Sequence, residues 1–120
     1  MLRHSKVYFS QAPRANRATG QRPDVSPALS FGEIEYILDD NLEAFHFPEK
    51  AKAVCDWKLA DFDPDRDYIC RAHSTDPIAD FSMLLSLSRR FGEGTVIRLL
   101  QWTKDRGADG GHYYPINLEI

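Results

Sequence analysis

The chain has 120 residues, of which 42% are hydrophobic and 28% charged, and its formal net charge is −3. This length is typical of one domain and is large enough to bury a core without disulfides or metals. No apolar run approaches the roughly 20 residues of a membrane-spanning helix, and the N-terminus lacks the apolar stretch of a signal peptide. We therefore expect a single cytoplasmic domain over residues 1–120, with no membrane segment.

The charges are unevenly distributed along the chain. Residues 1–30 carry five basic side chains and one acidic side chain, a balance of +4. Residues 31–120 carry ten basic and 17 acidic side chains, a balance of −7. A basic segment attached to an acidic body is suited to phosphate-rich or acidic partners.

The first predicted strand covers residues 6–10 and leads into a long loop at about 10–30. The loop contains three prolines and has no hydrophobic period of either strand or helix. A loop of this length inside a compact domain is usually functional or mobile. Its arginines, Arg14, Arg17 and Arg22, are candidate binding residues, because a guanidinium makes forked contacts with phosphate or carboxylate.

Apolar and charged side chains alternate over residues 33–38, which predicts the second strand. A helix is expected from Pro48, a residue that suits a first helical turn, to about Ala60. Apolar residues at three-residue spacing mark its expected inner face. They are Ala51, Val54 and Trp57.

Residues 68–102 predict a β-α-β unit. A strand at 68–72 is followed by Asp76, a good helix N-cap, and Pro77, a good first helical residue. A further strand at 95–102 follows the helix, so the two strands should be parallel. The helix residues expected against the sheet are Ile78, Phe81, Leu84 and Leu85.

The last strand, residues 113–120, contains Pro115, which lacks an amide donor and belongs at a sheet edge. Such an apolar edge needs cover, and a two-fold homodimer would supply it, although Pro115 itself opposes strand pairing. The element order β-β-α-β-α-β-β predicts an α/β fold with a mixed five-stranded sheet, with α+β as the alternative.

The junction at residues 73–77 is a candidate anion site. It joins the carboxyl end of a strand to the amino end of a helix, where ligands of α/β sheets often bind. Ser74 and Thr75 would add hydroxyl donors. The turn lacks the glycines of a phosphate loop, and Asp76 places a negative charge there, so a plain helix cap is the favoured interpretation.

Metal and catalytic patterns are not recognisable. The acidic run at 61–67 lacks the glycine and glutamate of a calcium loop, and the four histidines lack metal spacing. Cys55 and Cys70 are expected to be buried free thiols. We expect no cofactor, no metal and no catalytic residue, and favour a protein that is not an enzyme.

Six short stretches together resemble small uncharacterised proteins encoded by tailed bacteriophages, over most of the chain. They are residues 63–68 (DPDRDY), 76–77 (DP), 99–102 (LLQW), 113–115 (YYP), 26–28 (SPA) and 32–34 (GEI). The resemblance implies the cytoplasm of an infected bacterium as the setting, and it implies no particular chemistry.

The sequence is consistent with three functions. The first is a non-enzymatic phage accessory protein that binds a host or phage macromolecule, above all a protein. The second is a nucleic-acid-binding protein that uses the basic loop at 11–22. The third is a small nucleotide-binding or nucleotide-processing domain at the 73–77 turn.

Overall fold

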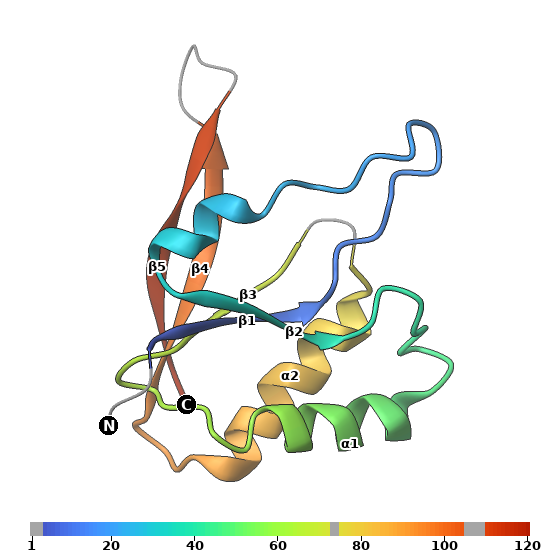
Figure 1. The fold of residues 1–120 in the computed structure, drawn as a ribbon. Coiled ribbons are helices and arrows are strands. Elements are labelled where there is room, and N and C mark those ends of the chain that lie inside the picture. The colour runs from blue at the N-terminus through green and yellow to red at the C-terminus, as the bar shows by residue number, and fades with distance from the viewer. Residues whose placement is uncertain (1–3, 73–74, 105–109) are drawn as a thin grey trace.

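The computed structural model describes residues 4–72, 75–104 and 110–120. The helices and strands occur in the predicted order, and a 3-10 helix precedes the second strand (Figure 1). The elements are β1 (Lys6–Gln11), η1 (Ser26–Ser30), β2 (Glu33–Leu38), α1 (Pro48–Lys58), β3 (Tyr68–Cys70), α2 (Pro77–Arg90), β4 (Val96–Lys104) and β5 (Gly111–Glu119). They form one compact α/β domain, as predicted.

The five strands form one mixed sheet with the order β2-β1-β3-β4-β5. β1 is parallel to both β2 and β3, and β3 is parallel to β4. The predicted parallel β-α-β unit is therefore confirmed. β5 is antiparallel to β4 and lies at the sheet edge, as was predicted from the missing amide of Pro115.

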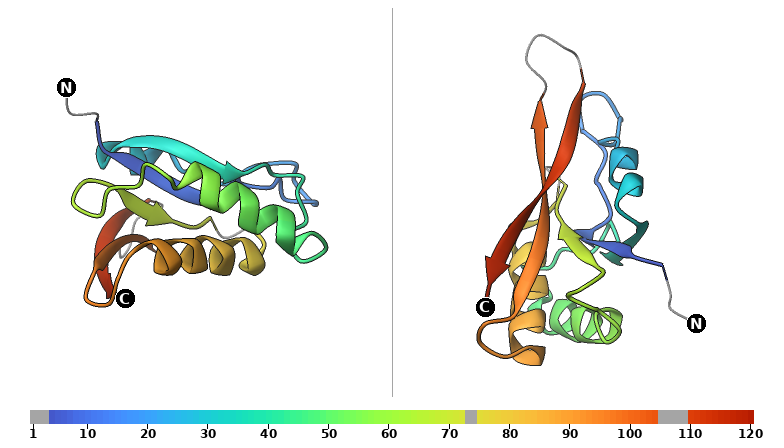
Figure 2. Two further views of the ribbon diagram at one scale, coloured as in Figure 1. Left: turned by 90° about the horizontal axis from the view of Figure 1, so that it is seen from below. Right: turned by 90° about the vertical axis from the view of Figure 1, so that its left-hand side faces the viewer.

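The two faces of the sheet are covered differently. α1 and α2 pack on one face, where Tyr8 and Ile69 of the sheet belong to the same buried cluster as Met83 and Leu87 of α2. η1 lies on the opposite face (Figures 1 and 2), where Ala28 belongs to a second buried cluster. The connection from β1 to β2 thus crosses one face, and the connections through α1 and α2 cross the other.

The segment between β1 and β2 is more ordered than an exposed loop over 10–30. β1 continues to Gln11, and η1 occupies Ser26–Ser30. Val25 and Ala28 are buried against the sheet, with 8% and 0% of their surfaces exposed. The irregular part of the predicted basic loop is therefore confined to residues 12–25.

The predicted inner face of α2 is wrong. The side chains that α2 buries are Ala79, Met83, Ser86 and Leu87. Phe81 and Leu85 are 61% and 57% exposed, because at 100° per residue they lie nearly opposite Met83 on the helix. The same correction applies to the other two predicted core residues of α2, Ile78 and Leu84, which are 37% and 38% exposed.

Packing between the helices explains this choice of face. α2 contacts both the sheet and α1, and small Ala79 and Ser86 allow a close approach. The Ser86 hydroxyl also donates to the Asp56 carboxylate of α1 at 2.7 Å. The second apolar stripe of α2, which contains Phe81 and Leu85, is left facing outward.

The predicted inner face of α1 is partly wrong. Ala51 and Cys55 are buried, but Trp57 is 72% exposed. Trp57 stands two residues after Cys55, about 200° further round the helix, so it points away from the core.

The cysteine prediction is confirmed, since both thiols are buried and free. Burial raises the pKa of Cys55 and of Cys70 from 9.0 to about 12. Among the described residues, no helix is long and apolar enough to cross a membrane.

Candidate functional site

The carboxyl ends of β1 and β3 lie side by side at the point where the strand order of the sheet changes direction. β1 connects to β2 on one side, and β3 lies on the other side of β1. Open α/β sheets commonly bind ligands at such a switch point. The residues that follow these two strands are therefore candidate site residues.

Gln11 occupies the centre of this switch point and is fully buried. Its Nε2 donates to the carbonyl oxygens of Asp39 and Leu42 at 2.9 and 2.7 Å. Its Oε1 accepts a hydrogen bond from the amide of Asp76 at 3.2 Å. Gln11 thereby joins the turn after β2 to the start of α2. Sequence reasoning placed it in the basic loop and missed this role.

The polar groups at the start of α2 bond to the protein itself. Asp76 is the predicted N-cap, and its Oδ1 accepts from the amide of Ile78 at 2.9 Å. Its Oδ2 accepts from the amide of Phe45 at 3.2 Å. The Thr75 hydroxyl donates to the carbonyl of Ala72 at 2.8 Å. An anion here would compete with the Asp76 carboxylate for the same helix end.

Ser74 is the other residue predicted for this turn, and it lies outside the described residues. Thr75 itself is only 6% exposed.

Two of the three predicted arginines contact the turn after β2. Arg14 donates from Nε to the Asp40 carbonyl and from Nη2 to the Leu42 carbonyl, both at 2.8 Å. Arg22 forms an ion pair with the Asp40 carboxylate at 2.5 Å. These two arginines attach the irregular segment to the turn. Asp40 was a sequence signal for the Arg22 contact only, since Arg14 bonds to backbone carbonyls.

Arg17 lies apart from the other two arginines, at the tip of the segment. The backbone folds back there, since the amide of Gly20 donates to the carbonyl of Asn16 at 2.7 Å. Arg17 is exposed, and its guanidinium has no ion pair or hydrogen bond with the described part of the chain.

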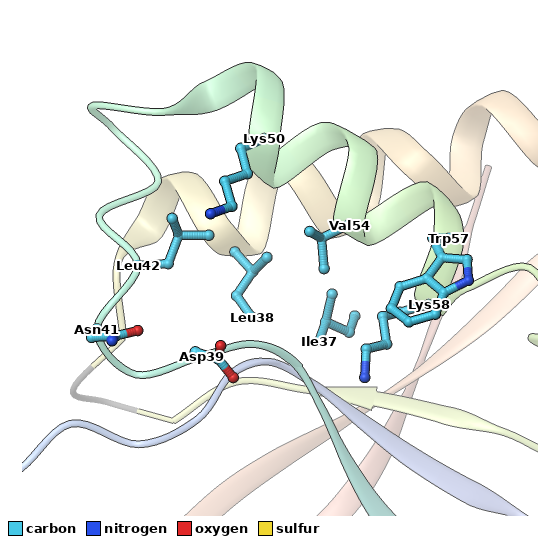
Figure 3. Close-up of a pocket in the computed structure, with 9 residues that line it drawn as sticks. All are labelled: Ile37, Leu38, Asp39, Asn41, Leu42, Lys50, Val54, Trp57 and Lys58. Carbon is cyan, nitrogen blue, oxygen red and sulfur yellow. The ribbon is translucent and has the colours of Figure 1, made fainter.

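A first groove lies between β2 and α1, and we call it the α1–β2 groove (Figure 3). Its volume is about 480 Å³. Aliphatic side chains form its floor, and two lysines and a tryptophan of α1 surround it. The lining residues are Ile37, Leu38, Asp39, Asn41, Leu42, Lys50, Val54, Trp57 and Lys58.

A second groove lies between α2 and the carboxyl end of β5, and we call it the α2–β5 groove. Its volume is about 430 Å³. All but two of its lining side chains are apolar, and the exceptions are Ser88 and Glu119. The apolar lining residues are Phe81, Leu84, Leu85, Leu87, Ile97, Leu118 and Ile120. Three of them are residues that sequence reasoning had placed against the sheet.

No three His, Cys, Asp or Glu side chains among the described residues come close enough to hold a metal ion. Within the acidic run at 61–67, Asp67 has a structural role, because it joins the run to the start of β1. Buried Asp67 accepts hydrogen bonds from the amides of Lys6 and Asp63 at 2.9 and 2.8 Å.

Comparison with protein-family models gives a match to the family described as phage Pam3 gp32-like protein, over residues 5–120. No curated protein and no solved structure matches the chain. The match confirms the resemblance to small phage proteins that the sequence suggested. It covers all five strands and both helices, so the chain belongs to the family of phage Pam3 gp32-like proteins.

Proposed function

We propose that this phage protein is a non-enzymatic accessory protein that binds a protein of the host or the phage in the host cytoplasm. The α2–β5 groove is the proposed docking surface. One observation carries the proposal: α2 turns Phe81 and Leu85 outward, 61% and 57% exposed, at the rim of an apolar groove.

Burial of these side chains by a partner would be favourable. Removing a Phe or Leu side chain from water contributes about 1.5–3 kcal/mol, and contiguous apolar patches on a protein surface commonly mark interaction sites. The core supports this interpretation, because α2 already has a complete buried stripe and does not need the outer one for folding. The outer stripe is thus available to another chain.

A second copy of the chain is an alternative partner, since β5 is an edge strand. Ile120 both donates to Thr95 and accepts from Gly94, so its backbone groups point towards the side of β4. Backbone groups alternate in direction along an antiparallel strand, so Pro115, five residues earlier, faces the free edge. Its missing amide interrupts that edge near its middle, which favours docking onto the groove over strand pairing.

The other two candidate functions have less support from the contacts. For nucleic-acid binding through 11–22, Arg17 is exposed, but Arg14 and Arg22 contact backbone carbonyls and Asp40. For a nucleotide site at 73–77, Asp76 already uses the helix end as its own cap.

The test is affinity capture of partners from infected-host lysate, with the full chain as bait. The double variant Phe81→Gln, Leu85→Gln should lose its captured protein, with at least about a tenfold fall in affinity. Leu29→Gln is the matched control, because Leu29 is 58% exposed but belongs to η1 on the opposite face. This control should retain the partner.

Other outcomes would contradict the proposal. Equal capture of the partner by the double variant would show that the α2–β5 groove is not the docking surface. Nucleic-acid binding that falls steeply with salt and is lost in Arg17→Ala would favour the basic segment. Thermal stabilisation by nucleotides would favour the 73–77 turn, and a concentration-dependent dimer lost in the double variant would favour a second copy.

A further inference from the structure

The opposite edge of the sheet is also open. β2 is the terminal strand of the sheet, and among the described residues its one strand neighbour is β1. The amide of Glu33 donates to the carbonyl of Ser5 at 2.9 Å. Because backbone groups alternate in direction along a strand, those of Ile34 and Tyr36 point away from β1. This edge can accept a further strand.

The α1–β2 groove lies beside this edge. Ile37 comes from β2, and Val54 from α1, so strand and helix form the two sides of one aliphatic surface (Figure 3). Trp57 stands at one end of the groove. A strand added to β2 would direct every second side chain towards α1, and this surface offers apolar contacts for those side chains.

The charges of the groove favour an acidic ligand. Figure 3 shows the side chains of Lys50 and Lys58 extending from α1 towards β2. Within the described residues neither ammonium has a hydrogen bond or ion pair, and the Lys58 ammonium lies 5.3 Å from the centre of the Trp57 ring. Of the described residues that line the groove, Asp39 alone is acidic. The groove therefore carries a local positive charge on a chain of net charge −3.

The acidic residues of β2 do not cancel this charge. Glu35 forms an ion pair with Lys6 at 3.0 Å, and neither Glu35 nor Glu33 lines the groove. Lys50 and Lys58, above the aliphatic floor of the groove, would complement a ligand in which carboxylates alternate with apolar side chains.

We propose that the α1–β2 groove binds an extended, acidic peptide segment of another protein, which adds as a strand to β2. Its apolar side chains contact Ile37 and Val54, and its carboxylates pair with Lys50 and Lys58. A peptide fits better than a nucleic acid, because a strand edge recognises main-chain amides, and the aliphatic floor offers no stacking surface for consecutive bases. This surface is separate from the α2–β5 groove, and either proposal can hold without the other.

The test is selection of binders from a random octapeptide library on the immobilised full-length chain. The peptides that are enriched should alternate apolar with acidic residues. Their affinity, measured by fluorescence anisotropy, should fall at least about tenfold in the double variant Lys50→Glu, Lys58→Glu. Lys52→Glu is the matched control, since Lys52 belongs to the same helix, is exposed and does not line the groove. Its affinity should change less than about threefold.

Hydrogen exchange tests strand addition itself. The amides of Ile34 and Tyr36 should become protected when a selected peptide is bound, while the circular dichroism spectra of all variants stay unchanged. Enrichment of basic peptides, no enrichment over a bare surface, or equal loss in Lys52→Glu would each overturn the proposal. Peptide binding without protection of these two amides would overturn strand addition.

Discussion

Replacing Gln11 by Met should destabilise the fold by about 2–6 kcal/mol. Met has nearly the same length and volume, so packing is retained while three hydrogen bonds are lost. The carbonyls of Asp39 and Leu42 keep other donors, namely the Leu42 amide and Arg14, so each lost bond there costs about 0.5–1.5 kcal/mol. The Asp76 amide loses its Gln11 partner in a buried position, which costs about 1–3 kcal/mol.

Urea unfolding, followed by circular dichroism, measures this change directly. The midpoint should fall with an unchanged denaturant dependence, because the surface exposed on unfolding is the same. Gln21→Met is the matched control, since Gln21 is exposed in the irregular segment, and its cost should stay within about 0.5 kcal/mol. A cost below about 1 kcal/mol for Gln11→Met would refute the view that this glutamine holds the switch point together.

Three further predictions concern packing and burial. Met83→Ala should lower the free energy of unfolding by about 2–5 kcal/mol, and Leu84→Ala should lower it by only about 1 kcal/mol. Urea unfolding measures both, and a larger loss for Leu84→Ala would contradict the observed face of α2. Gly32→Ala should lower the melting temperature, because its Cβ would lie 2.5 Å from the Ser5 carbonyl oxygen, and an unchanged temperature would show that this close approach is not needed. Cys55 and Cys70, with pKa values near 12 against 9.0 in an unfolded chain, should react with a thiol reagent at pH 8 only after denaturation. The thiols lose their protons at lower pH in the unfolded chain than in the folded protein. Their contribution to stability is therefore complete below pH 9 and falls as the pH rises towards 12. Rapid labelling of the native protein, or stability independent of pH in this range, would contradict the burial of the two thiols.

Several features of this protein were predictable because they depend on residues close together in the chain. Asp76 and Pro77 begin α2 as expected, since a cap and a first-turn proline act within one helical turn. Pro115 indicated an edge strand, because a missing amide constrains that residue wherever the strand lies. The parallel β3 and β4 followed from the length of the helix between them.

The candidate surfaces, by contrast, were decided by the tertiary structure. α2 has two apolar stripes, and its hydrophobic pattern does not distinguish the stripe that meets the sheet and α1 from the one that lines the α2–β5 groove. Arg14 and Arg22 were visible as basic residues, but their contacts with Asp40 depend on the turn after β2 lying beside the irregular segment. Strand order likewise left β2 as an open edge next to Lys50. Each of these arrangements joins residues far apart in sequence. Local sequence patterns do not distinguish between the alternative contacts, and only long-range packing decides which of them form.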